Sequence, residues 1–168
     1  MTTKKKLCGW ASQSEKRSVN GRKGDQSGKE VRLGYYYNFG QSEIIRFKSK
    51  ARGKKAARAM IAMCKNDNIG YGQSDRTSLF TQCREIGWNL KKISQIKKCN
   101  CDCSEICACA INFAFGKEIV PSYATTRSLK GLTAITHPKK FKTVSVNTAK
   151  QAGDMPLAAG KHVIMIVE

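Results

Sequence analysis

The clearest periodic pattern of apolar positions in the chain spans residues 50–66. Apolar side chains recur there every three or four residues, and this spacing predicts an amphipathic helix whose other faces carry basic residues. The apolar positions are Ala56, Ala59, Met60, Met63 and Cys64. A second helix is expected to begin after Ser74 or Asp75, either of which is a good N-cap, and to end at Gly87. A third is expected to run from an Asp102 cap to Gly116, which places Cys103 in its first turn.

Alternating and continuous apolar runs predict the strands. Val31–Asn38 alternates and Ile44–Phe47 is a second extended piece. In the C-terminal third, strands are expected at Leu132–Ile135, Phe141–Val146 and Val163–Val167, with turns at Pro138 and at Gly153–Pro156. Residues 11–30 are rich in small and polar residues and are expected to form a loop. Mixed helices followed by strands predict an α+β fold.

The absence of internal repeats and linkers favours one domain over residues 1–168, with a flexible or loop-rich N-terminus over 1–20. The 168 residues include 31 Lys+Arg and 12 Asp+Glu, for a formal charge of +19. Such a chain should bind a polyanion: nucleic acid, an anionic membrane surface or the anionic polymers of a bacterial wall. No apolar run is long enough to span a bilayer, and no apolar stretch typical of a secretory signal follows the basic start.

Five of the eight cysteines fall within residues 99–109, with the spacing C-x-C-x-C-x3-C-x-C. Structural zinc sites usually show pairs two to four residues apart with a second pair at a distance, and that second pair is missing. No metal ligands and no cofactor are therefore assigned, and Cys107 and Cys109 are equally compatible with simple packing.

Cys103 at a predicted helix start is a candidate nucleophile. The helix dipole and the unpaired backbone N–H groups there favour a thiolate, which lowers a cysteine pKa. A cysteine nucleophile needs a base, and the chain has two histidines. His137 precedes Pro138 and is expected in a turn, whereas His162 opens an apolar strand. We therefore select Cys103 and His162, a base on a strand facing a helix start, as in papain-type enzymes.

Asp102-Cys103-Ser104 resembles the Asp-Cys-Ser signature of NlpC-type and CHAP-type (cysteine, histidine-dependent amidohydrolase/peptidase) cell-wall hydrolases. The chain as a whole is similar to phage and prophage endolysins of Gram-positive hosts. The matching pieces are 24–31, 69–76, 99–104, Gly153-Asp154 and His162 with the strand behind it. The resemblance implies a papain-like fold, with the cysteine at a helix N-terminus packed on an antiparallel sheet that carries the histidine.

The resemblance also implies a reaction, partners and a location. Cys103 would be the nucleophile and His162 the base in amide hydrolysis of peptidoglycan, without a metal. Asp25, Gln26, Tyr71 and Gln73 would line the cleft, although packing explains them equally well. The partners would be peptidoglycan and anionic wall polymers rather than nucleic acid. Such an enzyme is made in the host cytoplasm and acts at the wall after release, or is packaged in a virion.

Three features depart from that family pattern. Glu105 follows Asp-Cys-Ser where a small residue is usual, and its charge would oppose a thiolate unless it faces solvent or pairs with a lysine. Lys161 separates Gly160 from His162. The residue that orients the histidine is also missing, because Glu168 lies about 20 Å along the strand, at ~3.3 Å per residue. Asp25, Glu30, a backbone carbonyl or water could take that role.

Two other classes of function remain open at this level. One is a basic nucleic-acid-binding protein, with zinc held by the cysteine cluster. It would show stoichiometric zinc and salt-sensitive affinity for nucleic acid. The other is a degenerate hydrolase that only binds the cell wall, a reading motivated by Glu105 and by the missing orienting residue.

Overall fold

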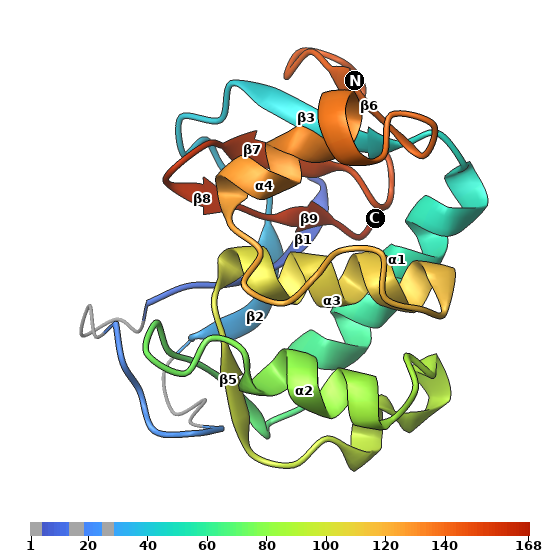
Figure 1. Ribbon diagram of the computed structural model, residues 1–168. Coiled ribbons are helices and arrows are strands. Elements are labelled where there is room, and N and C mark those ends of the chain that lie inside the picture. Colours follow the sequence, from blue (N-terminus) through green and yellow to red (C-terminus); the bar gives the residue numbers. More distant parts are fainter. Residues whose placement is uncertain (1–4, 14–18, 25–28) are drawn as a thin grey trace.

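The structure, a computed structural model, describes residues 5–13, 19–24 and 29–168. Its described part is an α+β arrangement of small sheets around a central helix (Figure 1). One antiparallel sheet has the order β2 (Val31–Tyr35), β1 (Leu7–Ala11), β9 (Met165–Ile166). A second antiparallel sheet has the order β6 (Phe141–Val144), β3 (Glu43–Phe47), β7 (Met155–Ala158), β8 (His162–Val163). Parallel strands β4 (Ile69–Tyr71) and β5 (Cys99–Cys101) form the third.

The helices are α1 (Lys50–Cys64), α2 (Ser78–Glu85), α3 (Cys103–Phe115) and the short α4 (Thr126–Gly131). A 3₁₀ segment, η1, covers Leu90–Gln95, and a π-helical turn, η2 (Leu132–Thr136), continues α4. In Figure 1, α3 crosses the middle of the molecule, with the sheet of β3 and β7 on one side and α2 on the other. Within the described residues, no helix combines the length and apolar composition needed to cross a bilayer.

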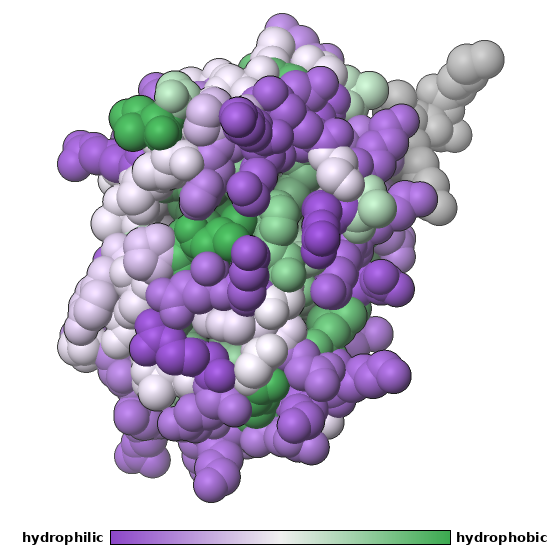
Figure 2. Space-filling model, turned by 45° about the vertical axis from the view of Figure 1, so that its right-hand side comes forward, coloured by the Kyte–Doolittle hydropathy of each residue, from purple (hydrophilic) through white to green (hydrophobic). Residues whose placement is uncertain are grey.

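Helix α3 is the core of the fold. Every residue from Cys103 to Ala114 is buried, so the helix has no solvent face and is surrounded by other elements. Gly116, with φ of 68°, ends it in the left-handed conformation that glycine adopts without strain. The outside is different in character: Figure 2 shows a face on which hydrophilic side chains cover most of the surface and surround a smaller apolar area.

The C-terminal segment joins the two antiparallel sheets. Strand β8 pairs with β7, whereas β9, only two residues further on, pairs with β1 in the other sheet. Ile164 lies between them, and its N–H donates to the carbonyl of Pro156. His162 therefore sits on an edge strand that is paired with β7 and continued by β9 into the other sheet, and β8 packs beside α3.

Much of the expected secondary structure is confirmed. The helix predicted over 50–66 is α1, capped by the Ser49 side chain and ending at Cys64. The helix predicted from an Asp102 cap to Gly116 is α3. The strands predicted near 31–38, 44–47 and 141–146 are present as β2, β3 and β6. Strands β2 and β6 end earlier than expected, and β3 begins one residue earlier. Helix α2 begins at Ser78, because Asp75 accepts a hydrogen bond from Ser78 Oγ and pairs with Lys23 rather than acting as the N-cap.

Four expectations were wrong. Leu132–Ile135 is helical rather than a strand, because a capping box between Thr125 and Ser128 starts a helix that runs into it. Met155 and Pro156, expected in a turn, belong to strand β7. Val163–Val167 is divided between β8 and β9. The N-terminal 20 residues, expected to be loop-rich, contain β1, which is the central strand of its sheet because Cys8, Trp10 and Ala11 are buried.

Candidate active site

Cys103 and His162 lie in one cleft of about 360 Å³. The thiol comes from the first residue of α3 and the imidazole from the first residue of β8. Tyr71 and Gln73, at the end of β4, line the same cleft. The other lining residues are Ala11, Ser12, Gln13, Tyr37 and Lys161. The fold thus brings together, from three separate parts of the chain, the selected nucleophile, the selected base and two of the four residues selected as cleft lining.

The Asp102 carboxylate holds Cys103 in the first turn of α3. Its Oδ1 accepts hydrogen bonds from the Glu105 N–H at 2.8 Å and from Ser104 Oγ at 2.9 Å. Its Oδ2 lies 3.1 Å from Arg76 Nε in an ion pair that is almost fully buried on the Asp102 side. Arg76 in turn donates to the carbonyl of Ala124. The helix start is therefore tied to two other segments of the chain.

The environment of the Cys103 thiol favours the protonated form. Burial raises its pKa from 9.0 to about 12, and the negative charge of Asp102 adds to the rise. The backbone N–H groups of Val163, Ser104 and Cys103 lower the pKa but do not offset the burial. The expectation that the helix start lowers this pKa was therefore wrong in its net sign, because a 9% exposed thiol is desolvated more than the backbone dipoles compensate.

His162 is also neutral near neutral pH. Burial lowers the pKa of its imidazole from 6.5 to about 4. The Phe39 ring meets the imidazole edge-to-face, with ring centroids 5.1 Å apart. Its buried Nε2 has no hydrogen-bond partner within the described residues. The cleft therefore presents a neutral thiol beside a neutral imidazole.

None of the orienting groups considered from the sequence contacts His162 in the part of the chain that is described. Glu30 is buried, but one of its carboxylate oxygens has no hydrogen-bond partner within the described residues, and Glu30 is not among the residues that line the cleft there. Glu168 is bound through its backbone N–H to the Leu7 carbonyl. Asp25 and Gln26 lie outside the described residues.

Tyr71 and Gln73 both pack and line the cleft, so the two interpretations of these residues are not exclusive. Gln73 Nε2 donates to the Tyr71 hydroxyl at 2.6 Å. The Tyr71 side chain is buried against the core, and burial raises the pKa of its phenol while the hydrogen bond from Gln73 opposes the rise. The phenol lines the same cleft as the candidate nucleophile.

The segment that leads to Asp25 and Gln26 is anchored beside Tyr71. Its N–H and carbonyl groups bind the neighbouring strands: Gly21 N–H donates to the Tyr71 carbonyl, and Gly24 N–H donates to the Cys99 carbonyl. Asn100 holds both ends of the segment, accepting from the Gly24 N–H and donating to the Gly21 carbonyl. These contacts fasten residues 21–24 to the parallel pair β4 and β5.

Glu105 neither faces solvent nor pairs with a lysine. Its side chain is fully buried, and its carboxylate makes no close hydrogen bond within the described residues, although the backbone N–H groups of Tyr123 and Ala124 lie near enough to lower its pKa. Burial and the Asp102 charge raise its pKa from 4.5 to about 7, while Arg76 opposes the shift. The carboxyl group therefore carries only part of a charge near neutral pH. Lys161, which departs from the family pattern by separating Gly160 from His162, lines the cleft.

The remaining cysteines form no candidate metal centre. Cys99, Cys101, Cys107 and Cys109 are completely buried and free of disulfides. Across residues 5–13, 19–24 and 29–168, no three histidine, cysteine or carboxylate side chains converge as a metal site requires. Since two of these thiols lie on β5 and two on α3, they pack into the core as small apolar groups. This arrangement gives no support to the zinc alternative.

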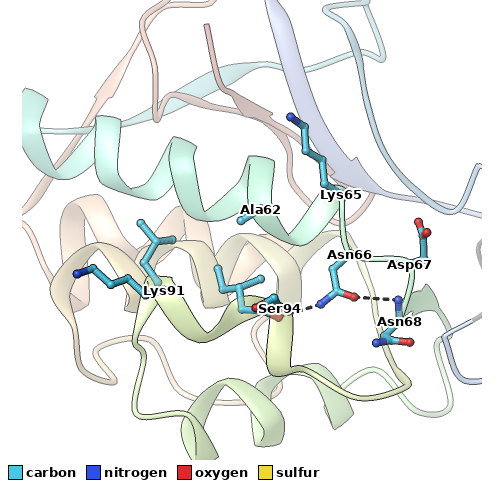
Figure 3. A pocket seen from close by; sticks show the side chains of 9 residues that line it. Ala62, Lys65, Asn66, Asp67, Asn68, Lys91 and Ser94 are labelled. Atoms are coloured by element: carbon cyan, nitrogen blue, oxygen red, sulfur yellow. Dashed lines mark hydrogen bonds between the residues drawn. The ribbon is translucent and has the colours of Figure 1, made fainter.

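A second cleft, of about 550 Å³, lies at the far end of α1 (Figure 3). It is lined by Lys65, Asn66, Asn68 and Lys91, among others. Asn66 donates to the Ile93 carbonyl and accepts from the Asn68 N–H, so these amides bind the chain itself. The lining contains no thiol or imidazole. It offers no nucleophile, and the cleft at Cys103 is the candidate active site although it is smaller.

Sequence reasoning missed the aromatic side of the cleft. Tyr37 lines it, and Phe39 contacts His162, yet neither was selected. Trp10, Tyr37 and Phe39 form a continuous row, with neighbouring ring centroids 5.4 and 5.5 Å apart. The run Tyr35-Tyr36-Tyr37 is the sequence feature that could have indicated this aromatic side, but it served only to predict a strand.

The fold and the cleft define an α+β protein with a cysteine and a histidine in a common cleft. The family model of the endolysin-like domain matches residues 9–168, and the chain belongs to that family. This membership indicates a role in lysis of the bacterial cell wall. No curated protein and no solved structure matches the chain.

Replacing Glu105 by glutamine should change how stability depends on pH. The folded state raises the Glu105 pKa from 4.5 to about 7, so it binds the proton more tightly than the unfolded state, and stability is lost as pH rises through that interval. Glu105→Gln should thus be more stable than the parent by roughly 3 kcal/mol at pH 8 and by less than about 1 kcal/mol at pH 5. Urea unfolding at both pH values measures this.

Glu85→Gln is the matched control, because Glu85 is exposed at the end of α2. It should leave the pH dependence of the free energy of unfolding as in the parent. An unchanged pH dependence in Glu105→Gln would show that Glu105 is not a buried acid in the folded protein.

Proposed function

We propose that the protein is a peptidoglycan hydrolase of the NlpC or CHAP type that cleaves an amide bond of the wall peptide, with Cys103 as nucleophile and His162 as base. The observation that carries the proposal is the common cleft of Cys103 and His162, at the start of a buried helix and on a fixed strand. The papain-like relation between this helix and the sheet that carries His162 belongs to the same proposal. Membership of the endolysin-like family supports the substrate class.

The pKa values indicate that the pair is neutral before the reaction, so the mechanism starts from a thiol and an unprotonated imidazole. His162, with its pKa lowered to about 4, is unprotonated at neutral pH and can accept a proton. As Cys103 Sγ attacks the amide carbonyl, the thiol proton passes to His162, and a C–S bond forms while the carbonyl oxygen becomes negative. His162 then gives that proton to the leaving amine as the C–N bond breaks. Water, deprotonated by His162, hydrolyses the thioester and restores the thiol.

Groups near Cys103 can stabilise the negative oxygen. The backbone N–H groups at the start of α3 point out of the helix, and the helix dipole favours negative charge there. The Tyr71 hydroxyl already accepts a hydrogen bond from Gln73, so its own proton can be donated to a ligand. Tyr71 is thus proposed to bind the substrate carbonyl or the amide next to it.

The charge of the chain fits the same substrate. With a net +19, the protein is attracted to teichoic acids and other anionic wall polymers, and the attraction raises its concentration at the wall. Synthesis in the host cytoplasm, followed by release to the wall, or packaging in a virion, completes the proposal. A second candidate is a wall-binding domain without activity, favoured by the raised pKa of Cys103 and the unpartnered Nε2 of His162.

Cys103→Ala and His162→Ala should each abolish the clearing of Gram-positive cell walls, because one removes the nucleophile and the other its base. Clearing is followed by turbidity, and free amines released from purified walls are counted in parallel. Circular dichroism should show that both variants stay folded, since each replacement is at a cleft wall.

His137→Ala is the matched control, because His137 Nε2 binds the Ile119 carbonyl away from the cleft. It should retain clearing. Lysis by Cys103→Ser at the parent rate would contradict the thiol mechanism. Wall binding by the parent without release of amines would instead favour the inactive wall-binding domain.

Lysis should slow several-fold as salt rises from 0.01 to 0.5 M, since the screening length falls from about 30 Å to below 8 Å. The rate is measured on walls with teichoic acids and on walls stripped of them. The dependence on salt should be much weaker on stripped walls. A lysis rate that is independent of salt on both kinds of wall would show that the net charge of the protein does not contribute to its action on the wall.

A further inference from the structure

A second groove lies over strands β1 and β2 and adjoins the candidate active site at Tyr37. Its volume is about 460 Å³, and Tyr37 lines both this groove and the cleft of Cys103. The other lining residues are Trp10, Lys29, Arg32, Leu33, Gly34 and Tyr35. Tyr37 is a common wall of the two hollows, so a substrate long enough to pass this side chain would reach both.

The groove is built around the Trp10 indole. Trp10 and Arg32 are opposite each other in the β1–β2 ladder, and the guanidinium lies over the indole, 5.0 Å from the ring centroid. Gly34 makes room for that ring, because a Cβ there would lie 2.5 Å from Trp10 Cη2. Arg32 is thus held by a ring on one side of the groove, a geometry that pre-orients its planar donors.

Arg32 differs from the other arginines that approach the core. Arg46 pairs with Asp154, and Arg76 pairs with Asp102. Arg32 has no ion pair within the described residues, and its buried Nε has no hydrogen-bond partner there. An unmatched donor of this kind costs roughly 1–3 kcal/mol unless an acceptor is supplied. A bound anion would supply it.

Tyr35 and Tyr37 give the groove an apolar side. They are 62% and 39% exposed, large values for aromatic side chains on a strand and the segment that follows it. Lys29 adds a second positive charge to the lining. The groove therefore suits a ligand with a negative group and short apolar parts, such as a peptide with alanyl residues and a free carboxylate.

We propose that this groove binds a carboxylate of the wall's stem peptide, with Arg32 as the anion-binding residue and Tyr35 and Tyr37 flanking the peptide. The inference rests on the proposed function, since the groove takes its substrate from the adjoining cleft. Arg32 is a binding residue and takes no part in bond cleavage. The same charge would attract a phosphate of a wall polymer, but the peptide is favoured because the groove shares Tyr37 with the cleft where its amide must lie.

The test is equilibrium binding by calorimetry to the full chain with Cys103→Ala, which prevents cleavage. The probe is alanyl-γ-D-glutamyl-lysine with the glutamyl α-carboxyl either free or amidated. The free carboxylate should bind about tenfold more tightly than the amide, as expected for a charge-assisted hydrogen bond. Adding Arg32→Gln should remove the preference, and adding Arg32→Lys should retain part of it.

Arg58→Gln is the matched control, because it removes one positive charge from an exposed position on α1. It should keep the tenfold preference. Equal binding of the two peptides, absence of binding, a preference that survives Arg32→Gln, or displacement of the peptide by millimolar glycerol phosphate would overturn the inference.

Failure of the inference and failure of the proposed function give different results. If the parent clears walls but its Cys103→Ala form shows no carboxylate preference, the groove is not the peptide site and the hydrolase proposal stands. If the peptide binds with the predicted preference but the parent releases no amines, the site is real and hydrolysis is not its purpose.

Discussion

The Asp102 carboxylate is the group on which the candidate site depends. It caps α3, anchors Ser104 and pairs with Arg76, and these contacts are buried. A helix as enclosed as α3 cannot satisfy its first N–H groups with water, so the cap must come from the chain itself. The same carboxylate contributes to raising the pKa of Cys103 and of Glu105. One residue therefore fixes where the thiol lies and biases it toward the protonated form.

That bias gives the site a consistent chemical character. Burial disfavours every charged form, so the thiol keeps its proton, the imidazole stays neutral and Glu105 takes up a proton more readily. A neutral pair avoids the cost of holding separated charges in a desolvated cleft, and charge needs to develop only as the thiol attacks. The edge-to-face contact with Phe39 fits this picture, because a ring edge positions the imidazole without adding a charge.

The local features of the site could be predicted from sequence. Asp102 and Gly116 mark the ends of α3, and an apolar strand after His162 marks a fixed position for a base. The features that depend on packing could not. The net pKa of Cys103 depends on how deeply α3 is buried, and Leu132–Ile135 was misassigned because the capping box upstream decides its conformation. Arg32 was not selected because its indole partner lies on a strand expected to be loop.

The most direct test of this account is the ionisation of the Cys103 thiol, followed by thiolate absorbance near 240 nm as the difference between the parent and Cys103→Ala. The account predicts no thiolate signal from Cys103 at pH 7, and a signal that develops only well above pH 9, because the pKa is raised to about 12. His162→Ala should leave this titration almost unchanged. A thiolate already present at pH 6, and lost in His162→Ala, would contradict the neutral pair and show a thiolate–imidazolium ion pair instead.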